Sequence, residues 1–244
     1  MKLRDYQLEA IQKMKTGCIL NGGVGSGKSL TSLSYYYMQN GGSEIFLTGG
    51  KHKKMKDPKD LYIITTARKR DTLEWEGELS HFLLSTNPDT SAYKNKVIVD
   101  SWNNVKKYKE VKGAFFIFDE QRVVGSGEWV KSFLKIAKTN EWILLSATPG
   151  DTWSDYIPVF IANGFYKNKS EFLREHAVFA RYSKFPKIEK WMGTGKLNRY
   201  RRMILVDMKF KRKTVQHHED IYVDYDIATY KDVMKSRWDI YKQE

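Results

Sequence analysis

The sequence predicts an α/β fold in which a mainly parallel sheet is covered by helices on both faces. Short apolar runs rich in β-forming residues alternate with segments of helical pattern, which is typical of parallel sheets buried on both sides. A glycine-rich stretch joins one of these runs to the helical segment after it, and polar residues directly follow the later runs. Because parallel strands gather their ligands at their carboxyl ends, these polar residues are expected to form one site.

The composition indicates a globular protein with a polyanionic partner. Its 244 residues are enough for one large domain or two small ones, and 41% hydrophobic residues suffice for a sizeable core. The net charge of +13 favours nucleic acid over a membrane, because no apolar run approaches the roughly 20 residues that span a bilayer. The amino terminus lacks a signal peptide's apolar stretch and the single cysteine excludes an internal disulfide, so a cytoplasmic location is expected.

The first elements are expected on either side of the glycine-rich stretch. Apolar residues at helical spacing predict an amphipathic helix over residues 4–15, and a short apolar run predicts a strand at 18–20. A second helix is expected over 30–38, after the glycines. Residues 44–48 are compatible with an inserted strand, and the lysine run 51–56 has the pattern of a solvated loop.

Further elements alternate in the same way beyond residue 60. Four more apolar runs are expected as strands of the sheet: residues 61–66, 97–99, 114–118 and 142–145. A helix is expected over 69–84, and aromatic-rich helices are expected over 153–165 and 170–179. The chain then offers a strand at 221–223 and a closing helix over 227–241 with one apolar face.

The glycine-rich stretch matches the phosphate-binding loop pattern G-x-x-x-x-G-K-[ST]. Its residues are Gly22, Gly23, Val24, Gly25, Ser26, Gly27, Lys28 and Ser29. The glycines let the backbone turn its N–H groups inward, at the positive end of the following helix, which makes a cradle for anions. Lys28 is expected to reach the β- and γ-phosphates, and the Ser29 hydroxyl to ligate Mg²⁺. The alternative, a glycine-rich turn with a chance lysine, is disfavoured by the full match between a strand and a helix.

Two carboxylates complete the predicted site. Asp119 ends a very apolar run and is expected to hold Mg²⁺ through its water shell. Glu120 is then available to orient and deprotonate the attacking water, as a general base in hydrolysis. The alternative is a helix N-terminus that favours negative charge, which the phosphate-binding loop makes the weaker explanation.

The ordered motifs resemble the first, RecA-like motor lobe of superfamily 2 helicases and translocases. They comprise Gln7, the phosphate-binding loop, Asp119-Glu120 and Ser146-Ala147-Thr148. The resemblance implies that the chain uses ATP with Mg²⁺ and that Gln7 reads the adenine base. Segments 65–68 and 99–102 occupy the places of motifs that contact the nucleic-acid strand, which implies such contacts for Arg68 and Ser101.

The spacing Leu73-x-Trp75-x-x-Glu78-Leu79 and the segment after Pro149 are most similar to the Swi/Snf-type branch, whose members track along duplex DNA. Relatives carry a second lobe with an arginine that completes the ATP site. We therefore expect residues 1–225 to be the first lobe and 226–244 a closing helix that leads toward a second lobe. Hydrolysis is expected to be weak until that lobe, in the same or another chain, is added.

Arg122 stands where many relatives carry His, Asp or another coupling residue, so that role is not transferred to it.

The stretch 181–213 holds twelve Lys or Arg residues against two acidic ones, and three of its arginines are predicted to contact phosphates: Arg199, Arg201 and Arg202. A solvated basic face is the alternative, with nucleic acid bound only near Arg68 and Ser101.

The leading functional hypothesis is thus an ATP-dependent helicase or translocase lobe acting on nucleic acid, with double-stranded DNA favoured. One alternative is a nucleotide-regulated nucleic-acid-binding module without turnover of its own. Another is a P-loop kinase, which leaves Ser146-Ala147-Thr148 unexplained.

Overall fold

The computed structural model describes residues 1–119, 123–181, 185–210, 219, 221–222 and 224–236. The chain divides into two compact units, Met1–Phe210 and Lys211–Glu244. The expected lobe boundary at residue 225 stays a prediction.

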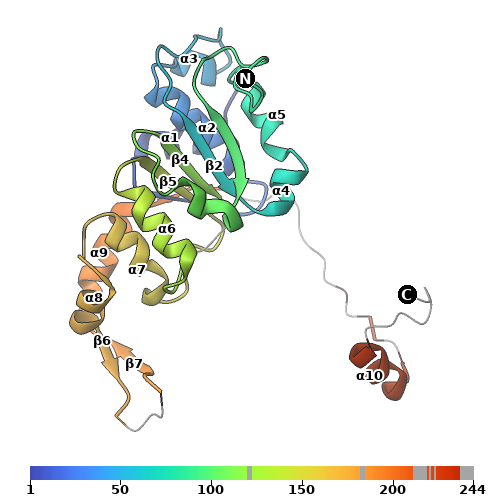
Figure 1. The fold of residues 1–244 in the computed structure, drawn as a ribbon, viewed down its shortest axis with the longest axis vertical. Coiled ribbons are helices and arrows are strands. Elements are labelled where there is room, and N and C mark those ends of the chain that lie inside the picture. The colour runs from blue at the N-terminus through green and yellow to red at the C-terminus, as the bar shows by residue number, and fades with distance from the viewer. Residues whose placement is uncertain (120–122, 182–184, 211–218, 220, 223, 237–244) are drawn as a thin grey trace. The chain divides into compact units, whose positions relative to one another are not determined.

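A parallel sheet forms the centre of the first unit (Figure 1). The described residues contribute six strands to it, in the order β3-β2-β4-β5-β1-β8, and every neighbouring pair is parallel. Their bounds are β1 Ile19–Asn21, β2 Leu61–Thr65, β3 Val97–Ser101, β4 Phe115–Asp119, β5 Glu141–Ser146 and β8 Leu205–Asp207. The predicted fold class, a parallel sheet within an α/β domain, is confirmed.

Alternate residues of the central strands enter two separate cores, one on each face of the sheet. On β4, for example, Phe115 and Ile117 belong to one core, while Phe116 and Phe118 belong to the other. Both faces are therefore buried, which is why these strands read as continuous apolar runs rather than as alternating ones.

Helices cover both faces of this sheet. The helices with side chains in the first core include α1 Asp5–Lys13, α2 Lys28–Gln39, α3 Glu44–Leu47 and α5 Glu74–Ser80. Those with side chains in the second core include the 3-10 helix η1 Trp102–Tyr108, α6 Glu128–Ala137, α7 Trp153–Ala162, α8 Lys169–His176 and α9 Thr194–Ile204. The short helix α4 Ala67–Asp71 follows β2 at the carboxyl end of the sheet.

Two expectations for the first half of the chain are wrong. Residues Glu44–Leu47 form the single turn α3 instead of a strand, and Thr48 makes only an isolated bridge with Lys2. The helix expected over 69–84 is broken into α4 and α5 at Leu73, whose left-handed φ of 54° interrupts helical geometry.

The basic stretch and the residues directly before it form elements that the sequence did not predict. After α8 the chain forms an antiparallel hairpin of β6 Ala177–Phe179 and β7 Ile188–Trp191, so the helix expected to reach residue 179 ends at His176. Helix α9 then leads into β8, which pairs with β1. The basic stretch therefore supplies the strand next to the one that carries the phosphate-binding loop.

The second unit contains helix α10 Ile227–Ser236 within its described residues. Its apolar side chains Ile227, Tyr230 and Met234 are exposed. The strand expected at 221–223 is not formed by Ile221 and Tyr222, and Val223 lies outside the described residues.

Candidate nucleotide-binding site

The phosphate-binding loop lies between β1 and α2, as predicted. Helix α2 begins at Lys28, two residues before the expected start, because Gly27 takes the left-handed φ of 79° that ends the loop. The N–H of Gly22 donates to the carbonyl of Ser146 at 3.1 Å, which fixes the start of the loop to the end of β5. The loop is thus held at the carboxyl edge of the sheet, with the positive end of a 12-residue helix behind it.

The side chain of Lys28 folds back over the loop. Its Nζ donates to the carbonyl oxygen of Gly22 at 2.7 Å and to that of Gly23 at 3.2 Å. These contacts place the ammonium group where the loop's glycines surround it, which is the position that a phosphate-binding lysine needs. Ser29 begins the same helix one residue later.

Gln7 lies beneath the loop and is 5% exposed. Its amide nitrogen donates to Thr31 Oγ1 at 3.2 Å and to the Gly27 carbonyl at 3.4 Å, while its Oε1 accepts from the Arg4 backbone N–H at 2.9 Å. Tyr6, next to it, donates its hydroxyl to the Ser26 carbonyl at 3.1 Å. Helix α1 therefore supports the loop from below, and contact of Gln7 with adenine stays a prediction.

Asp119 ends β4 in a buried environment, with 1% of its surface exposed. Its Oδ2 accepts from Thr65 Oγ1 at 2.9 Å and from Lys69 Nζ at 3.0 Å. The Trp102 indole N–H donates to the Asp119 backbone carbonyl at 3.0 Å. The contact with Lys69 was missed from the sequence, where the only signal for it is a basic run directly after the second strand.

One cavity of about 570 Å³ brings the predicted motifs together. Its lining comprises Val24, Gly25, Gly27, Lys28, Ser29, Lys69, Glu74, Asp119, Ser146, Ala147 and Thr148. The phosphate-binding loop, the carboxylate that ends β4 and the segment that begins at the last residue of β5 thus face one space, although they are far apart in sequence. Glu120 and Arg122 lie outside the described residues.

The oxygen donors of this cavity fit Mg²⁺. The Ser29 hydroxyl and the Asp119 carboxylate are hard oxygen ligands, and Mg²⁺ in nucleotide sites takes one or two carboxylates together with waters and phosphates. Among the described residues no group of three or more His, Cys, Asp or Glu side chains is gathered for a metal. Mg²⁺ held by Ser29 and Asp119 would complete its coordination with phosphate and water, as is usual for Mg²⁺ in nucleotide sites.

A second polar cluster lies beside α4, around Asp100 at the end of β3. Arg70 Nη1 donates to Asp100 Oδ1 at 3.2 Å and to Ser101 Oγ at 3.3 Å, and Tyr108 donates its hydroxyl to Asp100 Oδ2 at 2.6 Å. Burial alone would raise the pKa of Asp100, but hydrogen bonds from Asn104, Tyr108, the Ser101 N–H and Arg70 outweigh it and hold that pKa below its usual value. The cluster fixes α4 to β3.

The predicted nucleic-acid contacts differ in accessibility. Ser101 is 2% exposed and its hydroxyl accepts a hydrogen bond from Arg70, so its contact with nucleic acid stays a prediction. Arg68, on α4, is exposed. The α9 arginines, by which we mean the three predicted contacts on that helix, are exposed as well: Arg199, Arg201 and Arg202.

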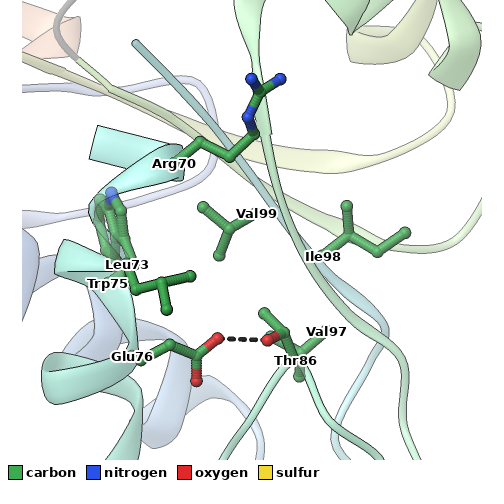
Figure 2. A pocket seen from close by; sticks show the side chains of 8 residues that line it. All are labelled: Arg70, Leu73, Trp75, Glu76, Thr86, Val97, Ile98 and Val99. Carbon is green, nitrogen blue, oxygen red and sulfur yellow. Dashed lines mark hydrogen bonds between the residues drawn. The ribbon is translucent and has the colours of Figure 1, made fainter. Parts of the chain in front are cut away.

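A smaller cavity of about 270 Å³ lies between α5 and β3 (Figure 2). It is lined by apolar side chains that include Leu73 and Val97, and Glu76 at its edge accepts a hydrogen bond from Thr86. Among the described residues, none lines both this cavity and the nucleotide cavity. Arg70 belongs to its lining, so this cavity adjoins the Asp100 cluster.

No protein-family model matches the sequence, and no curated protein matches it. Among solved structures, the SWI2/SNF2 ATPase core domain of Sulfolobus solfataricus is 17% identical, over 94% of this chain and 45% of its own, with a TM-score of 0.52. The Hef helicase domain of Pyrococcus furiosus is 18% identical, over 73% of this chain and 41% of its own, with a TM-score of 0.43. This chain spans less than half the length of either.

The likeness to the SWI2/SNF2 core confirms the predicted resemblance at the level of the fold. The chain has a RecA-like α/β fold, similar to that of this SWI2/SNF2 ATPase core domain. In the described part of the chain, every helix is too short or too polar to cross a membrane.

Proposed function

We propose that this chain is the first motor lobe of an ATP-dependent helicase or translocase that acts on nucleic acid, with double-stranded DNA favoured. One observation carries the proposal: the phosphate-binding loop, Asp119 and Ser146-Ala147-Thr148 line one cavity at the carboxyl edge of a RecA-like sheet. Such an edge is where open α/β sheets bind their ligands.

The chain's own residues have distinct roles in this proposal. The loop amides and Lys28 bind the phosphates, and Ser29 and Asp119 hold Mg²⁺, which would neutralise charge on the phosphates. Glu120 receives the proton of the attacking water, because Asp119 is already committed to the metal. Gln7 fixes the loop, and contact of Gln7 with the adenine base is proposed from the family resemblance.

Turnover is proposed to need a second RecA-like lobe, in the same chain or another, that supplies an arginine to the phosphates. Arginines supplied in this way contribute about 10³ to 10⁵ in rate in related phosphoryl-transfer enzymes. The net charge of +13 and the exposed arginines on α4 and α9 support nucleic acid as the partner.

Calorimetric titration with Mg²⁺-ATP tests the nucleotide site. Lys28→Ala removes the ammonium group that the loop surrounds, so we expect it to lose most of the affinity of the wild-type chain. Lys138→Ala serves as the matched control, since it removes an exposed lysine at the end of α6. Equal affinity in the wild type and Lys28→Ala would contradict the proposal.

Steady-state ATPase assays with and without duplex DNA then separate a motor from a binding module. They are run on this chain together with a second lobe. We expect DNA to stimulate hydrolysis, and Glu120→Gln to bind nucleotide normally while hydrolysing it far more slowly. A complete absence of turnover in every such assembly would favour the alternative of a nucleotide-regulated binding module.

A further inference from the structure

Lys69 contacts the carboxylate that the proposed function assigns to the metal. Its Nζ lies 3.0 Å from Asp119 Oδ2, and its side chain is only 19% exposed. Both side chains line the nucleotide cavity together with Lys28 and Ser29. The ammonium group of Lys69 therefore lies next to Asp119 and supplies a positive charge there.

Lys69 and a metal ion would have opposing effects at this carboxylate. A buried carboxylate is costly unless a positive charge or hydrogen-bond donors compensate it, and Lys69 supplies both. A divalent ion near Asp119 supplies a larger positive charge and repels the ammonium group beside it. The closer the metal is held to Asp119, the weaker the contact with Lys69 has to become.

We propose that Lys69 is a positioning residue that competes with Mg²⁺ for Asp119 and thereby links metal occupancy to the position of α4. The inference rests on the proposed function, because it takes Asp119 as a metal-binding group of a nucleotide site. Lys69 raises the Mg²⁺ concentration that nucleotide binding requires, and it leaves Asp119 when the metal is bound.

Helix α4 is short, so the contact between Lys69 and Asp119 contributes to holding the helix in place. It spans Ala67–Asp71 and is capped by Thr66, whose Oγ1 accepts from the Lys69 N–H at 3.3 Å. Its side chains reach two neighbours: Lys69 extends to Asp119 after β4, and Arg70 extends to Asp100 on β3. Release of Lys69 removes the first of these contacts.

The same turn carries the exposed Arg68, which the sequence predicts as a nucleic-acid contact. Lys69 and Arg68 are adjacent in the chain. A change in the contact of Lys69 with Asp119 therefore acts one residue away from the proposed nucleic-acid surface. This adjacency gives a physical route by which the metal and the nucleic acid can influence each other's binding.

The test measures the Mg²⁺ dependence of nucleotide binding in the full chain. A fluorescent ADP is kept at fixed concentration while Mg²⁺ is titrated, and the midpoint is compared between variants. Lys69→Met removes the charge at similar length, and Lys69→Gln removes it while keeping a donor. We expect Lys69→Met to lower the Mg²⁺ midpoint by about tenfold, since a hydrogen bond to a charged group is worth about 1.5 kcal/mol or more, and Lys69→Gln, which keeps a donor, to lower it by less.

Two controls separate competition from a structural effect. Lys69→Arg keeps the charge and is expected to retain a midpoint near that of the wild type. Binding of the fluorescent ADP in excess EDTA is measured for each variant, because Lys69 lines the cavity and its loss also acts on the nucleotide without the metal; the Mg²⁺ midpoint is then compared relative to this metal-free affinity. A general loosening of the site would weaken binding in EDTA as well. Circular dichroism verifies that each variant is folded.

An unchanged or higher Mg²⁺ midpoint in both neutral variants would overturn the inference. If the wild type binds the probe and Lys28→Ala does not, such a result rejects the role of Lys69 and leaves the nucleotide site intact. If the wild type fails to bind the probe at any Mg²⁺ concentration, the proposed function and this inference are rejected together.

Discussion

Replacement of Gly27 by alanine tests how the phosphate-binding loop is held on α1. Gly27 has a φ of +79°, and a Cβ added to it would lie 2.6 Å from the amide nitrogen of Gln7. Gln7 is buried and its amide is fixed by hydrogen bonds to Thr31 and to the Arg4 N–H, so it cannot move away without losing them. The substitution therefore combines backbone strain with a disrupted buried amide.

Each part of this cost has a characteristic size. A non-glycine residue in the left-handed region costs about 1–2 kcal/mol. A buried polar group that loses its hydrogen bonds costs about 1–3 kcal/mol more. We expect Gly27→Ala to lower the free energy of unfolding by about 2–5 kcal/mol, the sum of these two parts, measured by urea denaturation followed by circular dichroism.

Gly25→Ala is the matched control, because Gly25 has the same φ of +79° but a Cβ there would meet nothing within 4 Å. It is expected to show the strain alone, about 1–2 kcal/mol. Adding Gln7→Ala to Gly27→Ala removes the clash, so the double variant should be less destabilised than the sum of the two single variants. Equal losses in Gly25→Ala and Gly27→Ala, or additivity within about 0.5 kcal/mol in the double variant, would refute the reasoning.

Two further predictions concern the Asp100 cluster and the basic helix. Because the folded pKa of Asp100 is below its usual 3.8, its stabilisation is present above that pH and is lost as pH falls through the folded pKa. Asp100→Asn should lower the thermal midpoint near pH 7 and differ less from the wild type below about pH 4; a constant difference would contradict the ionic role. Reversal of the α9 arginines to Glu should weaken duplex binding and flatten its log-log salt slope, measured by fluorescence anisotropy, by up to about 0.9 for each phosphate that the protein no longer neutralises. The control reverses three exposed lysines of the loop 51–56 to Glu: Lys51, Lys53 and Lys54. This control should change the affinity and the salt slope less than the α9 variant does. Equal effects in the two variants would exclude α9 as a contact.

Local patterns determined much of the fold. The central strands could be predicted because burial on both faces requires an apolar side chain at every position, as in Phe115–Asp119 up to its last residue. The phosphate-binding loop could be predicted because its function depends on glycines and a lysine that are consecutive in the chain. Strand β8 could not be predicted, because three residues are too few to show a strand-like hydrophobic pattern. It is defined only by its pairing with β1.

The parallel α/β class and the residues of the phosphate-binding loop could be predicted from the sequence alone, because both are encoded by neighbours along the chain. The partners of the other polar residues depend instead on the tertiary structure. Lys69 meets Asp119 across a separation of 50 residues, and Ser101 meets Arg70 across 31. Such pairings depend on which strands lie side by side in the sheet, and strand order is set by packing of the whole domain rather than by any local pattern.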